Sequence, residues 1–175
     1  KALENAKVEN VKLKLTSLDW RKLNTELAEG TFDAVTCLGN SLTMLLAEQD
    51  QLEALSQFRR LLRNNGVLII DERNYQYILD NREKILQGNF QYSGKYVYCG
   101  DKVIGKPTEI SDTKVKWEII DEVTKKRGFI WVYPFKRGEL KNLLTKTGFA
   151  SVEQFNDYRV GENHNADFYQ YICIK

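Results

Sequence analysis

Two stretches decide the fold: Phe32–Ser41, FDAVTCLGNS, and Gly66–Tyr75, GVLIIDERNY. Each is an apolar run that ends in a polar cluster. Val67–Ile70 is apolar at four successive positions, which is typical of a strand covered on both faces in a parallel sheet. Ligands bind beyond the carboxyl ends of such strands. We therefore expect the active site at this rim, formed by Leu38, Gly39, Asn40, Ser41, Asp71, Arg73 and Asn74.

A helix is predicted between the two strands, from about Asp50 to Asn64. Asp50 followed by Glu53 resembles a capping box, and Asn65-Gly66 is a helix stop. Strand, helix and strand in this order predict a parallel crossover unit.

The segment before these strands is predicted to reach the same rim. Lys1–Lys7 is typical of the last turns of a helix, and Val11–Leu15 alternates apolar residues with lysine, which predicts a strand. Asp19 and Trp20 follow this strand. A lone Trp most often packs in a core, but here it is also a candidate to stack on a flat ligand ring. Asp19 either accepts a hydrogen bond from an exocyclic amine of the ligand or is an acid in a loop exposed to solvent.

The second half of the chain changes character after a helical pattern over Tyr75–Leu86. Three runs rich in Tyr, Trp, Val and Ile, separated by GDKVIGKP and TKKRG, predict an antiparallel sheet. A short amphipathic helix, Glu139–Thr147, precedes two closing strands that form an antiparallel hairpin. The three runs are Tyr96–Val103, Val115–Val123 and Phe129–Phe135, and the closing strands are Phe149–Phe155 and Asp167–Ile174.

Composition narrows the classes of protein. The 175 residues are 42% hydrophobic and 29% charged, which suits about one globular domain. No apolar run is long enough to span a bilayer, and no signal-peptide pattern is present, so we expect a cytoplasmic protein without a membrane partner. The net charge of +2 comes without a dense basic block, which argues against nucleic acid. Three widely spaced cysteines and one histidine favour reduced thiols and argue against a metal centre or a Ser-His triad.

The order of elements and the rim residues together resemble S-adenosylmethionine-dependent methyltransferases of the glycine N-methyltransferase type. The matching stretches are FDAVTCLGNS, GVLIIDERNY, GKYVY, VYPF followed by ELKNLL, and ADFYQYICIK, and the pairing of LGNS with IDxRNY is fairly specific. The resemblance implies an α/β chain with a partial Rossmann-like class I methyltransferase fold. Residues 1–90 and 136–175 would form the core, and residues 91–135 an antiparallel insertion that covers the substrate.

The resemblance also implies roles for single residues. Asn40 and Arg73 would hold the carboxylate of a small amino-acid substrate, and Tyr98 would help to close the site. S-adenosylmethionine would lie against Asp19 and Trp20 at its adenine and against Leu38, Gly39 and Ser41 near its amino-acid portion. In-line methyl transfer needs neither a metal nor a covalent nucleophile, and a guanidinium matches a carboxylate bidentately.

The chain departs from the family in one large respect. The glycine-rich turn GxGxG is absent from the sequence. The resemblance implies that this turn and its strands precede Lys1, so the chain is expected to be a fragment of a methyltransferase. An exposed strand edge would then favour pairing between chains, and we expect some self-association as a homo-oligomer.

Three alternatives stay open at this point. The acceptor is glycine, sarcosine or a similar amino acid, or else another small molecule. The chain is an enzyme, or a catalytically silent α/β module that acts through its exposed edge or a partner. Arg73 binds the carboxylate of the substrate, or it forms a surface ion pair with Glu72 or Asp71.

Overall fold

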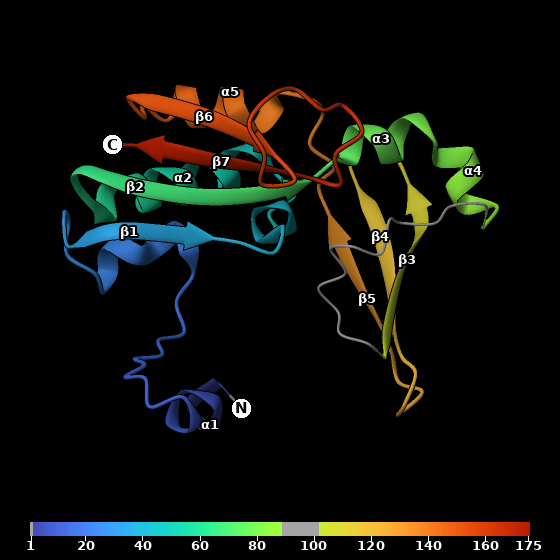
Figure 1. Cartoon of the computed structure of the whole chain (residues 1–175), viewed down its shortest axis with the longest axis horizontal. Helices are drawn as coiled ribbons and strands as arrows, with labels where there is room; N and C mark the ends of the chain where they lie inside the picture. Colours follow the sequence, from blue (N-terminus) through green and yellow to red (C-terminus); the bar gives the residue numbers. More distant parts are fainter. Residues whose placement is uncertain (1, 89–101) are drawn as a thin grey trace.

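The main sheet of the computed structural model, which describes residues 2–88 and 102–175, has four strands in the order β1-β2-β7-β6 (Figure 1). β1 and β2 are parallel, and β7 runs antiparallel to both β2 and β6. The predicted parallel pair and closing antiparallel hairpin are therefore confirmed. The strands are β1 (Phe32–Cys37), β2 (Leu62–Arg73), β6 (Ser151–Asn156) and β7 (Phe168–Ile174).

Two helices cover one face of this sheet. α2 (Glu48–Leu61) connects β1 to β2, and α5 (Glu139–Lys146) precedes β6. Their apolar side chains share one core with Leu68 and Ile70 of β2, both fully buried. Burying each such aliphatic side chain contributes about 1.5–3 kcal/mol to the stability of the fold. On the opposite face Val67 and Ile69 are only half-buried, so the described helices cover one face of β2 where two were expected.

The predicted bounds of the helix before β2 were wrong at both ends. α2 starts after Ala47 without a side-chain cap, and the carboxylate of Asp50 instead accepts a hydrogen bond from Arg21. The helix ends at Leu61 because β2 begins at Leu62. Gly66 is therefore inside the strand, where a Cβ atom would lie 2.9 Å from the carbonyl oxygen of Arg63.

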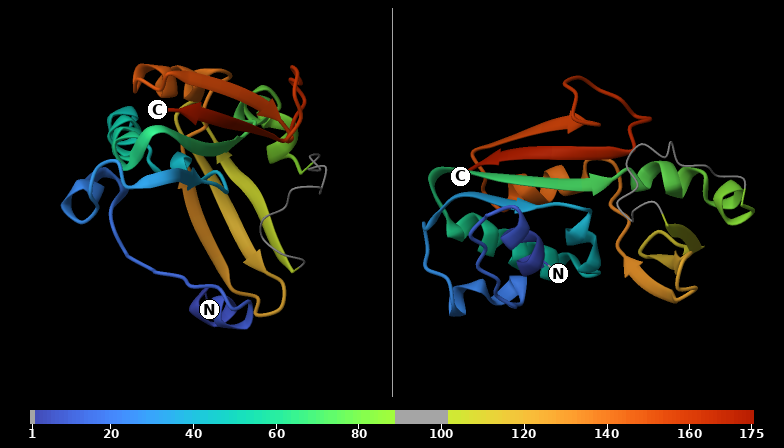
Figure 2. Two further views of the ribbon diagram at one scale, coloured as in Figure 1. Left: turned by 60° about the vertical axis from the view of Figure 1, so that its left-hand side comes forward. Right: turned by 60° about the horizontal axis from the view of Figure 1, so that its bottom comes forward.

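The strand predicted over Val11–Leu15 is also wrong. These residues have no regular secondary structure, and the side chains of Val11, Leu13 and Leu15 are 60%, 44% and 56% exposed. A strand needs a hydrogen-bonded neighbour, and no strand in the described part of the chain pairs with this segment. The preceding helix α1 (Ala2–Val8) is present as predicted, and it lies away from both sheets (Figure 1, Figure 2).

A second, antiparallel sheet is built by β3 (Val103–Ile110), β4 (Val115–Asp121) and β5 (Arg127–Val132). An antiparallel three-stranded sheet was predicted and is present, but its first strand is displaced: β3 includes Val103–Pro107 of the segment GDKVIGKP, which was predicted to be a turn. Pro107 is tolerated there because β3 is an edge strand with a register shift after this residue. Most of the predicted strand Tyr96–Val103 lies outside the described residues.

Two short helices join the sheets. α3 (Tyr75–Asp80) and α4 (Arg82–Leu86) follow β2 directly, and their buried side chains pack on β4 and β5 in a second apolar cluster. The carboxyl ends of β1 and β2 consequently point toward the small sheet (Figure 1). No helix within residues 2–88 and 102–175 is long and apolar enough to cross a membrane.

Glu72 is an acid inside the core. It is 2% exposed, and one of its oxygens accepts a hydrogen bond of 2.5 Å from the hydroxyl of Tyr171 on the neighbouring strand. Burial, against the opposing effect of the hydrogen bond from Tyr171 and with a smaller contribution from the negative charges of Glu139 and Asp71, raises the pKa of Glu72 to about 8.

The raised pKa predicts that stability depends on pH. The folded state holds the proton of Glu72 more tightly than the unfolded chain, so the stabilisation is complete below about pH 4.5 and is lost as the pH rises toward about 8. Between these values the free energy of unfolding should fall by about 1.4 kcal/mol per pH unit relative to a Glu72→Gln variant. Urea denaturation of both proteins at pH 5.5 and 7.5 measures this. The exposed Glu122→Gln is the control, and equal slopes for wild type and Glu72→Gln would contradict the expectation.

Candidate active site

The rim is organised by the carboxylate of Asp71, near the carboxyl end of β2. It is 1% exposed and accepts hydrogen bonds from two successive backbone amides at the end of β1, Gly39 N at 3.1 Å and Asn40 N at 2.6 Å. Hydrogen bonds to a charged acceptor are worth about 1.5–3 kcal/mol each. Asp71 therefore ties the loop after β1 to β2.

This loop has an unusual backbone. Gly39 and Asn40 both have left-handed conformations, with φ of 72° and 61°. Glycine and asparagine are the residues that adopt this conformation at least cost. The following 3-10 helix, η2 (Ser41–Met44), is fixed by hydrogen bonds from the hydroxyl of Ser41 to the carbonyl of Leu38 and from that of Thr43 to the carbonyl of Asn40.

The amide side chain of Asn40 bridges three elements. Its oxygen accepts from the backbone N–H of Arg73 at 3.1 Å, and its nitrogen donates to the hydroxyl of Tyr75 at 2.7 Å. Burial raises the pKa of Tyr75, so this hydroxyl stays neutral. Because one acceptor and one donor are fixed by different partners, the amide has a single orientation, with its nitrogen toward Tyr75.

The guanidinium of Arg73 is held by aromatic rings from both sheets. Its carbon lies 4.5 Å from the ring centre of Phe168 in β7 and 5.3 Å from that of Trp117 in β4. Each cation–π contact contributes about 0.5–2 kcal/mol. Glu72, one of the two acids considered as its partner, is on the opposite face of β2 by strand alternation and bonds to Tyr171 instead.

Asp19 and Trp20 lie at the start of the 3-10 helix η1 (Trp20–Thr25), which packs on α2. Hydrogen bonds from Arg21 hold the pKa of the Asp19 carboxyl well below its usual range, and Arg21 also reaches Asp50 in the first turn of α2. The half-buried Trp20 ring meets the ring of Phe58 edge-on at 5.8 Å. The packing contact expected of a lone Trp is thus present.

The structure brings five of the eight predicted site residues together at one rim: Leu38, Gly39, Asn40, Ser41 and Arg73. Tyr98 lies outside the described residues. Asp71 was expected at the rim without a defined role, whereas no role was predicted for Tyr75, Phe168 or Trp117. An acid directly after an apolar strand is the signal for Asp71, whereas the two aromatic rings leave no local signal because they come from distant strands.

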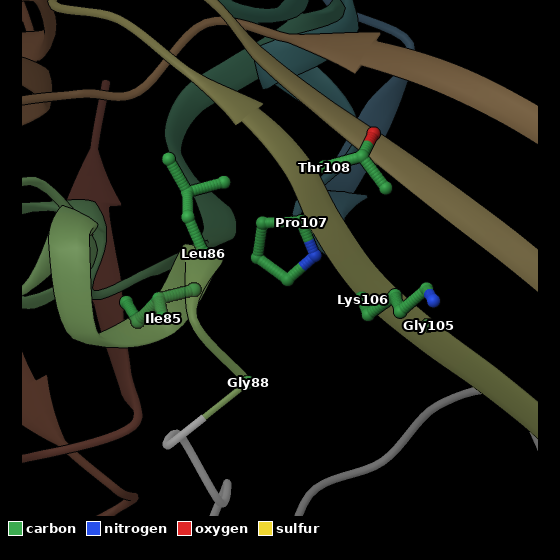
Figure 3. Close-up of a pocket in the computed structure, with 7 residues that line it drawn as sticks. All are labelled: Ile85, Leu86, Gly88, Gly105, Lys106, Pro107 and Thr108. Atoms are coloured by element: carbon green, nitrogen blue, oxygen red, sulfur yellow. The ribbon is translucent and has the colours of Figure 1, made fainter.

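A cavity of about 380 Å³ lies apart from the rim, between α4 and β3. Figure 3 shows the ring of Pro107 facing Ile85 and Leu86 across it. Among the described residues that line it, Lys106 is the one charged side chain, and none is an acid or a histidine. In the described part of the chain, no group of three or more His, Cys, Asp or Glu residues is arranged to hold a metal ion.

Sequence comparisons give a consistent picture. A methyltransferase domain model matches residues 1–70. The glycine/sarcosine N-methyltransferase of Aphanothece halophytica is 32% identical over the whole chain, which covers 63% of that protein. Human glycine N-methyltransferase is 44% identical over 35% of the chain, which covers 23% of it. The chain thus spans about three fifths of the length of the first of these relatives.

Solved structures agree on the fold. The match to an S-adenosylmethionine-dependent methyltransferase from Clostridium acetobutylicum covers 99% of this chain and 69% of the solved chain, with a TM-score of 0.69 at 18% identity. The match to an amino pentose methyltransferase from Micromonospora echinaspora, solved with S-adenosylmethionine bound, covers 99% of this chain and 68% of the solved chain, with a TM-score of 0.55 at 14% identity. The fold is that of the class I methyltransferases, as predicted.

The central position of Asp71 can be tested with Asp71→Asn. The amide keeps one acceptor oxygen but turns donor hydrogens toward a backbone N–H, so one amide of the pair Gly39 and Asn40 loses its partner. We expect a loss of about 1–3 kcal/mol in the free energy of unfolding, measured by urea denaturation. Asp33→Asn removes the same charge from an exposed ion pair with Arg63 and should cost at most about 1 kcal/mol. Equal losses in the two variants would refute the role of Asp71.

Proposed function

Because residues 1–70 match a methyltransferase domain model and the whole chain is similar to glycine/sarcosine N-methyltransferases, we propose that the protein that carries it is an S-adenosylmethionine-dependent methyltransferase that methylates the amine of glycine, sarcosine or a similar small amino acid. S-adenosylmethionine would be the methyl donor. The observation that carries the proposal is the contact between the two predicted carboxylate-binding residues, the hydrogen bond of 3.1 Å from the backbone of Arg73 to the amide of Asn40.

The rim suits recognition of a carboxylate. Phe168 and Trp117 lie against the guanidinium of Arg73, and its N–H donors point outward in the guanidinium plane, which is the geometry that binds a carboxylate bidentately. The amide nitrogen of Asn40 carries two hydrogens, one of which is given to Tyr75. The second is proposed to join Arg73 at the same carboxylate.

The residues proposed to line the donor fit an organic molecule with apolar and polar parts. The predicted burial of the strand before Leu38 is wrong, because Cys37 is the one buried residue of β1. Leu38 itself is 48% exposed, so apolar surface is available beside the loop. Trp20 is half-buried with its ring against Phe58, and the hydroxyl of Ser41 lies next to the carbonyl of Leu38. S-adenosylmethionine supplies a methyl group on a positively charged sulfur.

The chain's own contribution would be positioning. With the carboxylate fixed by Arg73 and Asn40, the neutral amine of the amino acid is directed toward the methyl group. Such alignment of two reactants can lower a barrier by up to about 7–11 kcal/mol. Tyr98 is proposed to help close the site. The chemistry calls for no metal ligand and no nucleophilic side chain.

We also keep three wider proposals. Residues 1–90 and 136–175 form the methyltransferase core, and residues 91–135 cover the substrate. The protein works in the cytoplasm, in keeping with the free thiols of Cys37 and Cys173. The chain self-associates through the edge of β1, the outer strand of the described sheet, where Phe32 is 38% exposed. Sedimentation velocity over a hundredfold range of concentration would detect this, and a single monomer peak throughout would reject it.

The amino-acid assignment is tested by Arg73→Ala in the full-length protein that carries this chain. Losing the charged contact to the carboxylate should raise the KM for glycine by about 10- to 150-fold, which corresponds to about 1.5–3 kcal/mol. Calorimetric affinity for S-adenosylhomocysteine should change by less than about threefold, because Arg73 does not hold the donor.

The matched control is Arg63→Ala, which removes the same side chain from an exposed ion pair with Asp33 and should leave both quantities unchanged. Unaltered activity of Arg73→Ala on glycine would reject the amino-acid assignment. A parallel loss of donor affinity and activity would instead assign Arg73 a structural role. Titration of the 175-residue chain alone with S-adenosylhomocysteine then tells whether its rim suffices for binding.

A further inference from the structure

A second groove, of about 440 Å³, lies at the opposite edge of the main sheet from β1. Its walls are the first half of α5, the edge strand β6 and the loop that leads into β7. None of the rim residues Leu38–Ser41 or Arg73 lines it. The volume is within the range of about 300–1,000 Å³ that is usual for pockets that bind small molecules.

A buried hydroxyl in the lining of the groove lacks a partner. Tyr169 is 4% exposed, and its hydroxyl makes no hydrogen bond to any described residue. Buried polar groups are almost always paired, and an exception calls for an explanation. Burial and, more weakly, the negative charges of Glu72 and Asp157 raise the pKa of Tyr169, whereas the neighbouring guanidinium of Arg137 lowers it, so this hydroxyl is a neutral donor beside Arg137.

The charges around the groove favour a negative ligand. Arg137 and Lys141 both line it, and within residues 2–88 and 102–175 neither forms an ion pair with a carboxylate. Glu153 also lines it, but strand alternation turns its side chain to the other face of β6, since Val152 and Gln154 pair with residues facing α5. Glu162, on the exposed loop, also lines the groove, and the carboxyl groups of Glu72 and Asp157 lie near enough to act on the hydroxyl of Tyr169.

The start of α5 adds a partial positive charge. Its N-cap is Gly138, which has no side chain to accept from the first-turn amides, and it lines the groove. The carboxylate of Glu139 does not take this place, because it accepts from the backbone N–H of Lys136 and from the hydroxyl of Tyr133. Helix N-termini of this kind favour anions.

We propose that this groove is a second ligand site, which binds a small organic anion through a carboxylate or phosphate group. The oxygens of that group accept hydrogen bonds from the hydroxyl of Tyr169 and the guanidinium of Arg137, and Lys141 and the start of α5 complete the positive surroundings. The site is separate from the proposed methyl transfer and uses none of its residues.

Two probes test the proposal, inorganic phosphate and succinate, each at 10 mM against sodium chloride of matched ionic strength. A ligand that binds only the folded state raises the melting temperature, here by roughly 3 °C or more for at least one probe. The probe that acts identifies the preferred oxyanion. The absence of a shift beyond that of sodium chloride for both probes overturns the proposal.

Three variants locate the effect. Tyr169→Phe should melt at a higher temperature than wild type without ligand, since it removes an unpaired buried hydroxyl, and should bind the active probe about 5- to 10-fold more weakly. Arg137→Gln should bind it at least 10-fold more weakly. Lys146→Gln, on the same helix but paired with Glu48 outside the groove, should bind it like wild type.

Equal loss of binding in Arg137→Gln and Lys146→Gln would overturn the proposal by showing a general charge effect. A Tyr169→Phe variant that melts lower and binds unchanged would also overturn it, because the hydroxyl would then be structural. The Arg73→Ala variant should show the same ligand-induced rise in melting temperature as the wild type. The outcome is therefore independent of whether methyl transfer to glycine is established.

Discussion

The carboxylate of Asp71 is the interaction on which the site depends. A single acid at the end of one strand accepts from two consecutive amides at the end of its parallel neighbour. That pair of bonds stabilises two left-handed residues in a row, a backbone that would otherwise be costly at Asn40. With the loop fixed, the amide of Asn40 falls between the backbone of Arg73 and the hydroxyl of Tyr75.

The second sheet is joined to the first at the same place. Tyr75 begins α3 immediately beyond the rim and is buried against the apolar cluster of β4 and β5. Arg73, two residues earlier, stacks on one ring from each sheet. The backbone N–H of Tyr133, just after β5, also donates to the carbonyl of Thr43 at 2.7 Å. The antiparallel sheet is thus fixed to the rim by several contacts of different kinds, which suits a wall of a binding site.

Much of the fold could be predicted from the sequence because the signals are local. The sequence predicted β1, β2, α5 and the closing hairpin to within a few residues. The signals were four apolar residues in succession, a glycine after a polar stretch and a short amphipathic helix. Val11–Leu15 has an equally clear alternation but no neighbouring strand among the described residues, and alternation alone does not form a strand. Pro107 suggested a turn, although an edge strand accommodates it. The rim residues followed from the carboxyl ends of the two predicted strands, and their individual roles came from a resemblance. Their hydrogen bonds could not be foreseen, since Asp71 and Asn40 are 31 positions apart.

The hydrogen bonds of Asn74 determine which parts of such a protein can change in evolution. Its side chain caps α3 through the amide of Tyr77 and donates to the carbonyl oxygens of His164 and Ala166 in the loop beside the second groove. These loop contacts involve only main-chain atoms, so they fix the path of the loop whatever side chains it carries. Substitutions in this loop can therefore accumulate and alter the lining of the second groove while the rim at the end of β1 and β2 keeps its shape. The chemical character of one edge of the sheet can thus change independently of the other edge.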